Sequence, residues 1–181
     1  MSAPAPSLFP ALYLYPLNDT FAPRYIHLSH NAHVRIGRQT SAMTTPSEQN
    51  GYFDSRVLSR QHAEVWEEGN KIFIKDLKSS NGTFINGNRL SPEGLESDPV
   101  ELHSDDVVEF GIDIVGEDNT TVVRHKVAAR VMCILSEQDA QIINGCQDRV
   151  TTDHTNATVC RIENNTIMVS LKFSTCLPHY F

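Results

Sequence analysis

The sequence predicts an all-β protein, a sandwich of about ten to eleven short strands, and three observations support this fold class. Apolar and polar residues alternate over short stretches between residues 11 and 130, turn-forming residues separate these stretches, and none of them keeps an apolar period of 3.6 residues. Short alternating strands with frequent turns are typical of sandwiches and barrels rather than of helical domains.

The expected strands follow one another along this region, at residues 12–15, 25–28, 33–36, 63–67, 71–76, 83–85, 88–90, 100–102, 106–110, 112–115 and 122–127. The polar stretch 39–54 contains Pro and Gly and is expected to be a long loop, a kind of segment that often carries function. Asn86 and Gly87 have the composition of a two-residue hairpin loop. We expect their side chains to have no role beyond that turn.

Composition divides the chain into three parts. Residues 1–10 are rich in Pro, Ala and Ser and are expected to be a disordered N-terminus, and residues 11–130 form the domain. Residues 131–181 are a tail of uncertain structure with one candidate strand at 166–171. This tail carries all four cysteines, whose spacing contains no CxxC pair. The spacing argues against a zinc site and favours reduced thiols in a cytosolic protein.

The charge and hydropathy of the chain exclude several classes of protein. Its formal net charge of −7 argues against a general nucleic-acid binder, although a small basic pocket can exist on an acidic surface. No run of 18 or more apolar residues is present, and the N-terminus has no basic region of the kind that begins a signal peptide. We therefore expect no membrane span, a cytoplasmic location, and no glycosylation at the Asn-X-Ser/Thr sites.

Three short motifs occupy expected connections between strands: GR at residues 37–38, SRQH at 59–62 and SSNGT at 79–83. Each is weak evidence by itself. In this order within an all-β region they resemble the forkhead-associated (FHA) domain, whose pattern is GR, SxxH and NG at about these separations. The resemblance covers about residues 11–130 and implies an FHA-type β-sandwich that binds phosphothreonine.

Longer matches narrow the resemblance to a subgroup. The segments FDSRVLSRQHAEVW, KDLKSSNGTFINGNRLS and DDVVEFGIDI, and the acidic insertion 91–98, are similar to the FHA domains of sarcolemma-associated proteins and their fungal counterparts. This implies partners in an assembly that links phosphatase 2A to kinase signalling, the striatin-interacting phosphatase and kinase complex. Members of the subgroup also carry coiled coils and a C-terminal membrane anchor. Neither is expected from these 181 residues, as in a truncated product or an incomplete gene model.

The chemistry of the motifs suits a phosphothreonine, which carries about −1.5 to −2 charge and strong acceptor oxygens. Arg38 supplies a planar guanidinium fork, which lysine cannot reproduce. Ser59 and Ser80 supply hydroxyl donors, and Arg60 a second positive charge and a backbone N–H. Asn81, with a donor and an acceptor, suits the peptide backbone beside the phosphorylated residue. By resemblance these five residues are the ligand contacts of the family.

Three further motif residues are expected to hold the loops in shape. Gly82 permits a backbone conformation closed to other residues. His62 is expected to hydrogen-bond neighbouring loop backbone, and Gly37 is the third of these residues. The resemblance assigns these three positions to architecture rather than to ligand contact.

Other readings of the same residues remain. Ser59 and His62 are not surrounded by a nucleophile motif such as GxSxG, so we expect no catalytic residues, no enzyme activity, no cofactor and no metal. We expect a phosphothreonine-containing protein as the partner. The alternative is a constitutive protein–protein or self-association sandwich in which the phosphate pocket is unused.

Overall fold

The computed structural model of the protein describes residues 9–141, except for the side chain of His30. Thirteen strands dominate this part of the chain, together with the short 3-10 helices η1 (Ser29–Asn31) and η2 (Ala42–Thr44) and a helical stretch at residues 137–141. The strands are β1 (Ala11–Pro16), β2 (Arg24–His27), β3 (Val34–Arg38), β4 (Tyr52–Phe53), β5 (Ala63–Glu68), β6 (Lys71–Asp76), β7 (Thr83–Ile85), β8 (Asn88–Arg89), β9 (Val100–Leu102), β10 (Val107–Phe110), β11 (Ile114–Val115), β12 (Val122–Arg124) and β13 (Val127–Ile134).

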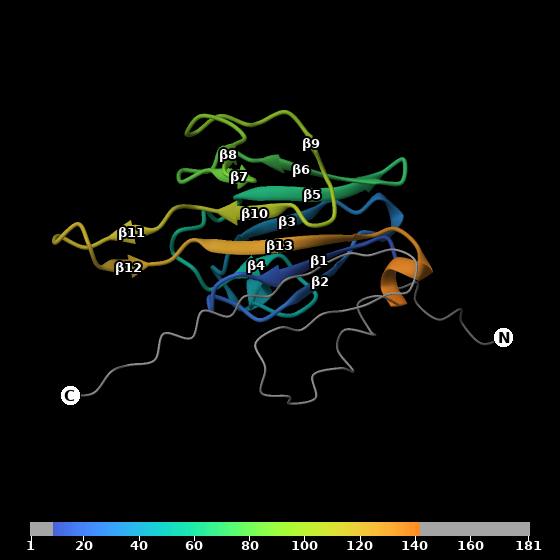
Figure 1. Cartoon of the computed structure of the whole chain (residues 1–181), viewed down its shortest axis with the longest axis horizontal. Coiled ribbons are helices and arrows are strands. Elements are labelled where there is room, and N and C mark those ends of the chain that lie inside the picture. Colours follow the sequence, from blue (N-terminus) through green and yellow to red (C-terminus); the bar gives the residue numbers. More distant parts are fainter. Residues whose placement is uncertain (1–8, 142–181) are drawn as a thin grey trace, which may run out of the picture. The chain divides into compact units, whose positions relative to one another are not determined.

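The strands form two main sheets and one separate ribbon (Figure 1). The six-stranded sheet has the order β2-β1-β13-β10-β7-β8, and the five-stranded sheet has the order β4-β3-β5-β6-β9. Neighbouring strands are antiparallel except for β3 and β4, which are parallel. Strands β11 and β12 pair only with each other within the described residues. The predicted all-β sandwich is confirmed.

Strand directions bring several connections to one end of the sandwich. In the five-stranded sheet Ala63, the first residue of β5, lies between Ile36 near the end of β3 and Asp76 at the end of β6. In the six-stranded sheet the last residue of β10 pairs with the first residues of β7 and β13. These strand ends all lie on the left in Figure 1. We call this the loop end, and its connections are residues 17–23, 39–51, 54–62, 77–82, 90–99 and 111–126.

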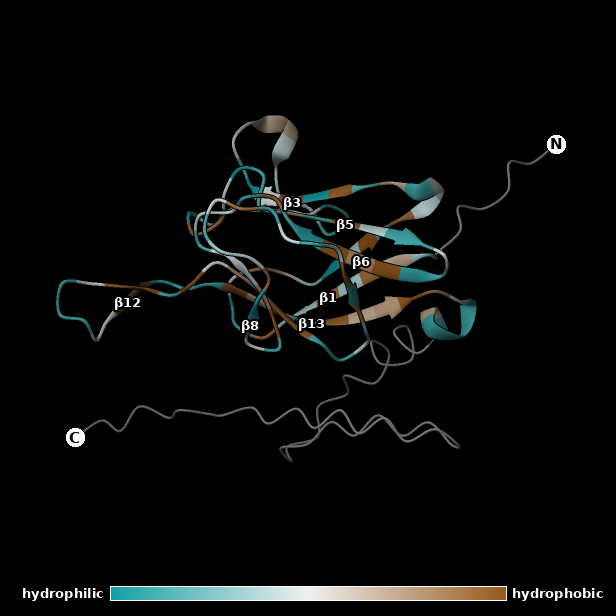
Figure 2. Ribbon diagram, turned by 90° about the horizontal axis from the view of Figure 1, so that it is seen from above, coloured by the Kyte–Doolittle hydropathy of each residue, from teal (hydrophilic) through white to brown (hydrophobic). Residues whose placement is uncertain are grey.

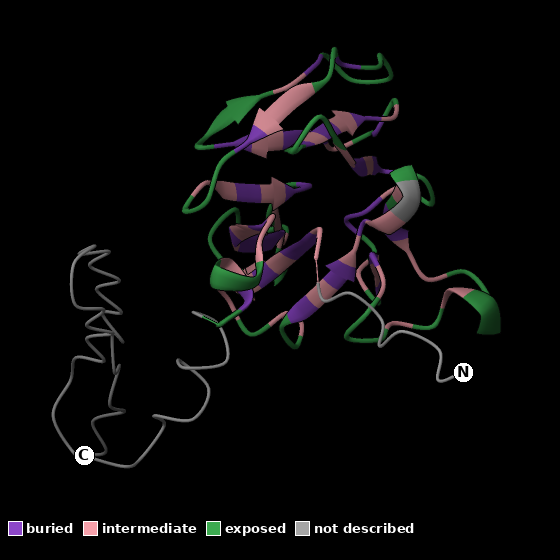
Figure 3. Ribbon diagram, turned by 90° about the vertical axis from the view of Figure 1, so that its right-hand side faces the viewer, coloured by how far each residue is buried: buried purple, intermediate pink, exposed green. Residues whose placement is uncertain are grey.

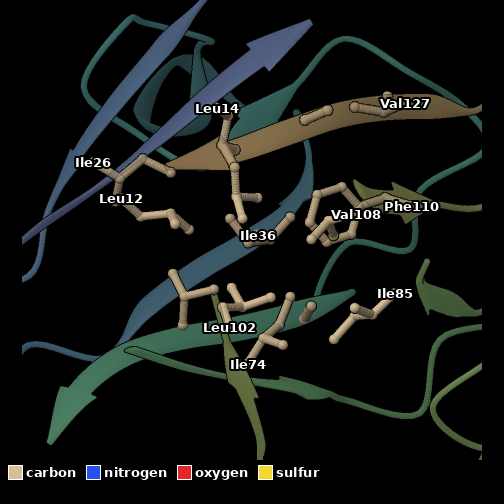
Figure 4. Close-up of a cluster of buried hydrophobic side chains, with 14 of the residues drawn as sticks. Leu12, Leu14, Ile26, Ile36, Ile74, Ile85, Leu102, Val108, Phe110 and Val127 are labelled. Atoms are coloured by element: carbon tan, nitrogen blue, oxygen red, sulfur yellow. The ribbon is translucent and has the colours of Figure 1, made fainter. Parts of the chain in front are cut away.

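The core lies between the two sheets. Alternate residues of the strands are buried (Figure 3), and hydrophobic residues concentrate in the strands (Figure 2). The inward side chains converge in one cluster (Figure 4), which includes Leu12, Leu14, Ile26, Ile36, Ile74, Ile85, Leu102, Val108, Phe110 and Val127. Full burial of one such side chain stabilises the fold by about 1.5–3 kcal/mol. This cluster therefore supplies the stability on which the loop end rests.

The structure differs from the expected strands at several points. The expected strand 122–127 is divided, because the amide of Lys126 bonds to the side chain of Asp113, and its carbonyl to the side chain of Asn18, before β13 begins. Strand β13 continues to Ile134 because its residues 129–134 pair with β1. The long loop 39–54 contains η2 and the short strand β4. The expected N-terminal disorder at residues 1–8, the candidate strand 166–171 and Cys146, Cys160 and Cys176 lie outside the described residues.

The second Asn-Gly pair forms the expected turn but also does more. Asn86 and Gly87 have φ values of 50° and 81°, as a two-residue hairpin turn between β7 and β8 requires. The expectation that their side chains have no further role is wrong. The Asn86 side chain donates to the Asp106 carboxylate at 2.8 Å and accepts from the Val107 amide at 2.9 Å. The turn is thereby tied to β10.

Phe110 offers a test of the core. Its ring is completely buried, and truncation in Phe110→Ala is expected to lower the free energy of unfolding by about 3–5 kcal/mol because a large cavity remains. Urea denaturation measures this difference. The matched control is Met43→Ala, at a side chain 93% exposed, which should change stability by no more than about 0.5 kcal/mol. Equal effects of the two substitutions would contradict the assignment of Phe110 to the core.

Candidate functional site

The three predicted motifs meet at the loop end, joined by hydrogen bonds between segments far apart in the sequence. The amide of Arg38 donates to the carbonyl of Ser59 at 3.0 Å. The amide of Ser80 donates to the hydroxyl oxygen of Ser59 at 3.1 Å. The side chain of Asn81 donates to the carbonyl of Val57 at 2.8 Å. The loop 54–62 is therefore the centre to which β3 on one side and loop 77–82 on the other are bonded.

The sequence predicts that Arg38 lies on a loop. In the structure it is instead the last residue of β3. It pairs with Phe53 of β4, so its backbone belongs to a sheet while its side chain reaches the loop end. Its side chain makes no hydrogen bond or ion pair with any residue in the described part of the chain, and its Nε atom is buried without an acceptor. A buried donor left unsatisfied in this way costs about 1–3 kcal/mol. An acceptor from a ligand would remove that penalty.

The buried Nε of Arg24 is also without an acceptor, yet that side chain has a different role. Its terminal nitrogens donate to the carbonyls of Ser47 and Tyr52, and its guanidinium lies 5.1 Å from the centre of the Phe53 ring. Burial lowers the pKa of Arg24 from its ordinary value, an effect partly offset by the nearby Glu48 carboxylate. Arg24 thus anchors the long loop after Arg38, whereas the guanidinium of Arg38 is left free.

The hydroxyl groups of Ser59 and Ser80 have donor capacity to spare. The Ser59 oxygen accepts the Ser80 amide, which leaves its O–H free to donate elsewhere. The Ser80 side chain is exposed and has no partner in residues 9–141. Two hydroxyl donors are therefore available beside each other, one on loop 77–82 and one on loop 54–62, whose Ser59 carbonyl accepts the Arg38 amide.

Asn81 uses only part of its hydrogen-bonding capacity. One N–H of its amide donates to Val57, which sets the position of the side chain, while its carbonyl oxygen and second N–H have no partner within the described residues. The side chain is half-buried at the mouth of the loops. It can therefore still accept from, and donate to, an extended peptide backbone.

His62 is completely buried and bridges loops 54–62 and 77–82. Its Nδ1 accepts from the amide of Ser59 at 3.1 Å, and its Nε2 donates to the carbonyl of Gly82 at 3.0 Å. The ring also packs edge-on against Phe110, with the ring centres 5.8 Å apart. Because Nδ1 accepts a hydrogen bond, the imidazole is neutral in this arrangement. Burial lowers its pKa, an effect that Gly82 and Asp76 partly oppose.

Glycine is required at two of the predicted supporting positions. A Cβ on Gly37 would lie 2.3 Å from the carbonyl oxygen of Arg60, which leaves no room for a side chain. Gly82 has a φ of 86°, a conformation that other residues rarely adopt, and a Cβ there would lie 2.8 Å from Nε of Arg89. Close packing at Gly37 and the backbone bend at Gly82 bring β3 and loops 54–62 and 77–82 within hydrogen-bonding distance of one another.

Sequence reasoning missed Asp76, the buried carboxylate beneath loop 77–82. It accepts hydrogen bonds from the amide and hydroxyl of Ser79 and from the hydroxyl of Thr83, at 2.6–2.8 Å. Ser97 of the acidic insertion is bonded to the backbone of Asp76 on both sides. The Ser97 amide donates to the Asp76 carbonyl, and the Ser97 hydroxyl oxygen accepts from the Asp76 amide. A signal for this role was present, because Asp76 continues the inward positions of Ile72 and Ile74 along β6. A charged residue at an inward position needs buried partners.

Charge is distributed unevenly around the site. Arg56 and Arg60 are exposed on loop 54–62, and the Arg60 side chain has no partner in the described part of the chain. On the other side Glu96 of the insertion pairs with Lys75 at 2.8 Å and lies 4.0 Å from Lys78. The chain is acidic as a whole, yet no ion pair within residues 9–141 neutralises the cations of Arg38, Arg56 and Arg60. A local site for an anion is thus compatible with the net charge.

Metal binding and membrane insertion are the other functions considered for the described residues. Between residues 9 and 141 no group of three or more His, Cys, Asp or Glu side chains could hold a metal ion. In the same part of the chain no helix has the length and apolarity needed to cross a membrane.

A sequence profile of the FHA domain matches residues 34–111, a segment that contains all eight predicted site residues. An uncharacterised protein of Schizosaccharomyces pombe is 46% identical over 124 residues, which cover 67% of this chain and 40% of the relative. The sarcolemmal membrane-associated protein of Mus musculus is 37% identical over 150 residues, or 82% of this chain and 16% of the relative. The chain thus spans less than half the length of either relative.

Solved structures of FHA domains are also similar to the chain. The FHA domain of a hypothetical protein of Arabidopsis thaliana superposes with a TM-score of 0.49 and 21% identity, covering 74% of this chain and 94% of that domain.

The close packing of Gly37 can be tested by stability. In Gly37→Ala the new methyl group would meet the Arg60 carbonyl, and the forced shift of loop 54–62 is expected to lower the free energy of unfolding by about 1–3 kcal/mol or more. Urea denaturation is the measurement. Gly116→Ala is the control, because a Cβ there meets its neighbours only at 3.4 Å and beyond. The assignment of Gly37 to close packing is wrong if Gly37→Ala is no more destabilising than Gly116→Ala.

The bridge made by His62 predicts a pH dependence of stability. The folded-state pKa of His62 is lowered, so below about pH 6.5, the ordinary histidine pKa, the unfolded chain takes up a proton that the folded chain does not. The free energy of unfolding should therefore fall as the pH drops from about 6.5 towards the folded-state pKa.

The variant His62→Gln provides the comparison for this pH dependence. Glutamine can accept and donate hydrogen bonds but does not titrate. Urea denaturation at several pH values should show a shallower decline between about pH 6.5 and 5 in the variant than in the wild type. Parallel pH profiles of the two proteins would show that His62 does not control this dependence.

Proposed function

Because the chain belongs to the forkhead-associated domain family, whose members are phosphothreonine-binding modules rather than enzymes, we propose that it binds a phosphothreonine segment of a partner protein at the loop end. The ligand contacts are Arg38, Ser59, Arg60, Ser80 and Asn81. Binding recruits the phosphorylated partner to a signalling complex.

The observation that carries this proposal is the free guanidinium of Arg38. Its Nε is buried without an acceptor, and the backbone beside it is bonded to Ser59. A phosphate offers several charged acceptor oxygens, and a guanidinium binds them with two parallel hydrogen bonds. The free hydroxyls of Ser59 and Ser80 and the charge of Arg60 supply the remaining donors. This combination is complementary to a phosphoryl group with about two negative charges.

Asn81 has a separate role in the proposal. Its carbonyl oxygen and remaining N–H bind the peptide backbone next to the phosphothreonine, while its bond to Val57 keeps the amide oriented. Gly37, His62 and Gly82 do not contact the ligand; they hold the loops in the geometry that the ligand needs. Binding energy is not spent on ordering these loops, because they are already hydrogen-bonded to one another.

We extend the proposal to the kind of complex. The chain is similar to the sarcolemmal membrane-associated protein, and the sequence resemblance suggests an assembly of phosphatase 2A with kinases of the striatin-interacting type. In such an assembly the phosphothreonine partner is a signalling protein whose phosphorylation controls its recruitment. A cytoplasmic location of the domain is part of the same proposal.

Peptide titration tests the binding activity. A phosphothreonine peptide taken from an oriented phosphopeptide library screen should bind more tightly than its phosphoserine and unphosphorylated versions, as measured by calorimetry or fluorescence anisotropy. Arg38→Ala should weaken binding of the phosphopeptide by at least about tenfold, because charge-assisted hydrogen bonds are lost. Arg38→Lys should restore little of the loss, because lysine lacks the planar fork.

A charge-matched control separates a specific contact from a general change in charge. Lys71→Ala removes one positive charge at the β5–β6 turn, at the opposite end of the sandwich, and should leave phosphopeptide affinity unchanged. If all three peptides bind wild type equally, or if Lys71→Ala and Arg38→Ala act alike, the proposal is wrong. A partner complex that survives phosphatase treatment would favour constitutive association instead.

A further inference from the structure

The exposed apolar side chains of the described residues gather at one end of the sandwich. The large hydrophobic residues that are exposed there are Leu17, Met43, Leu95, Ile112, Val115 and Val123. Leu17 follows the end of β1, Met43 lies in the loop after Arg38, and Leu95 lies in the insertion bonded to Ser79. The other three lie on or beside the β11–β12 ribbon. Every one of them is therefore on a segment at or next to the loop end, where the phosphothreonine site is proposed.

The ribbon is the most prominent of these segments. Residues 112–125, which we call the arm, leave the end of β10, form the hairpin β11–β12 and return to β13. Figure 1 shows the arm projecting well beyond the sheets at the left, and Figure 2 shows hydrophobic residues along it. Ile112, Val115 and Val123 are 46%, 45% and 58% exposed. These three β-branched residues on one projecting element provide apolar surface that a partner can bury.

The arm is braced by specific contacts at its base and its tip. At the base the Asp113 carboxylate accepts the Lys126 amide at 2.8 Å, and the Lys126 ammonium lies 2.6 Å from the Glu109 carboxylate. At the tip the Asp118 carboxylate accepts from the hydroxyl of Thr121 and from the amides of Thr121 and Thr120. These hydrogen bonds lower the pKa of Asp118. The arm is thus an ordered projection, which presents its valines at little further entropic cost.

The base of the arm is bonded directly to the ligand loops. The amide of Gly111, the residue that links β10 to the arm, donates to the carbonyl of Gly82 at 2.9 Å. The position that a Cβ of Gly111 would take lies only 3.0 Å from the carbonyl oxygen of Val57. Gly82 and Val57 are the backbone partners of His62 and Asn81. The base of the arm is consequently attached to the two loops that carry the proposed phosphothreonine site.

We propose that the arm is a second contact for the same phosphorylated partner, and that Ile112, Val115 and Val123 bind an apolar, extended segment flanking its phosphothreonine. The inference rests on the proposed function of the loop end. A phosphothreonine with its nearest neighbours buries little surface, and small interfaces bind weakly. Apolar contacts along the arm add buried area and select partners by the residues that flank the phosphate.

The position of the arm favours a partner over the remainder of this chain as its occupant. Strand β1 begins, and β13 ends, at the end of the sandwich opposite the arm. The described segment therefore continues into the rest of the chain, on both sides, from the far end. A peptide bound at the loop end, in contrast, begins beside the base of the arm. A second copy of this chain is the other candidate occupant, and the experiment below distinguishes it.

The test uses the full chain and synthetic phosphothreonine peptides of three kinds. One is short, one is extended by Ser and Gly on both sides, and one is extended by Val, Ile and Leu on both sides. Wild type should bind the apolar peptide about tenfold more tightly than the other two, a difference of about 1.4 kcal/mol. The double variant Val115→Ser/Val123→Ser should bind all three with the affinity of the short peptide.

Matched variants identify the source of the effect. Val115→Thr/Val123→Thr keeps the β-branched shape, so the arm retains its strand propensity, and should lose the same selectivity. Leu17→Ser removes an apolar side chain outside the arm that is exposed to a similar degree, 43%. This variant should keep the selectivity for the apolar peptide. Equal affinity of wild type for the apolar and polar extensions overturns the proposal, as does an equal loss of selectivity in Leu17→Ser.

Two further outcomes separate the proposals from each other. If no peptide binds wild type in a phosphate-dependent manner, the proposed function itself fails. If phosphate-dependent binding is intact but the extensions make no difference, only the role of the arm fails. Sedimentation velocity tests whether a second copy of this chain binds the arm. A wild-type dimer that dissociates in the double variant would assign the arm to a second copy and overturn its assignment to the partner.

Discussion

A neutral imidazole between two loops is the interaction on which the binding end of this domain depends. His62 accepts the amide of Ser59 on one loop and donates to the carbonyl of Gly82 on the other, while its ring packs against Phe110 in the core. One buried side chain thus links both ligand loops to the hydrophobic interior. A buried hydrogen bond of this kind is demanding, since a donor or acceptor left without its partner costs about 1–3 kcal/mol. Any other relative position of the two loops would break these bonds and incur that cost, so the bonds fix how the loops lie.

A second buried polar group supports the same end from below. Asp76 collects three donors from Ser79 and Thr83, and its backbone is bonded on both sides to Ser97. Around this ordered interior the cations of Arg38 and Arg60 are without partners in the described residues. Most buried and half-buried polar groups in a folded domain are paired, so the unpaired Arg38 supports the proposal that the loop end is a recognition surface. Arg24, which is buried but bonded through two nitrogens, shows the contrast.

Much of the fold and part of the site could be predicted from the sequence. Alternating strands such as Lys71–Asp76 bury one face because the strand period is two, and that pattern is visible without coordinates. The turn at Asn86-Gly87 is predictable for an equally local reason, since both residues tolerate positive φ. The bond from Asn86 to Asp106 was not predictable, because it joins residues brought together by the pairing of β7 and β10. The division of the expected strand 122–127 has the same origin in long-range contacts.

By itself, the sequence determined the all-β class, the order of the strands and the three motifs with their residue types, because these depend on local periodicity and local chemistry. The tertiary structure decided which of those residues have free bonding capacity. Arg38 and Arg24 are both arginines on strands, and only their surroundings separate a free guanidinium from a structural anchor. The structure also decided that the arm projects beside the ligand loops, because its position follows from the bond between Gly111 and Gly82. Such contacts join segments distant in the sequence, and no local pattern encodes them.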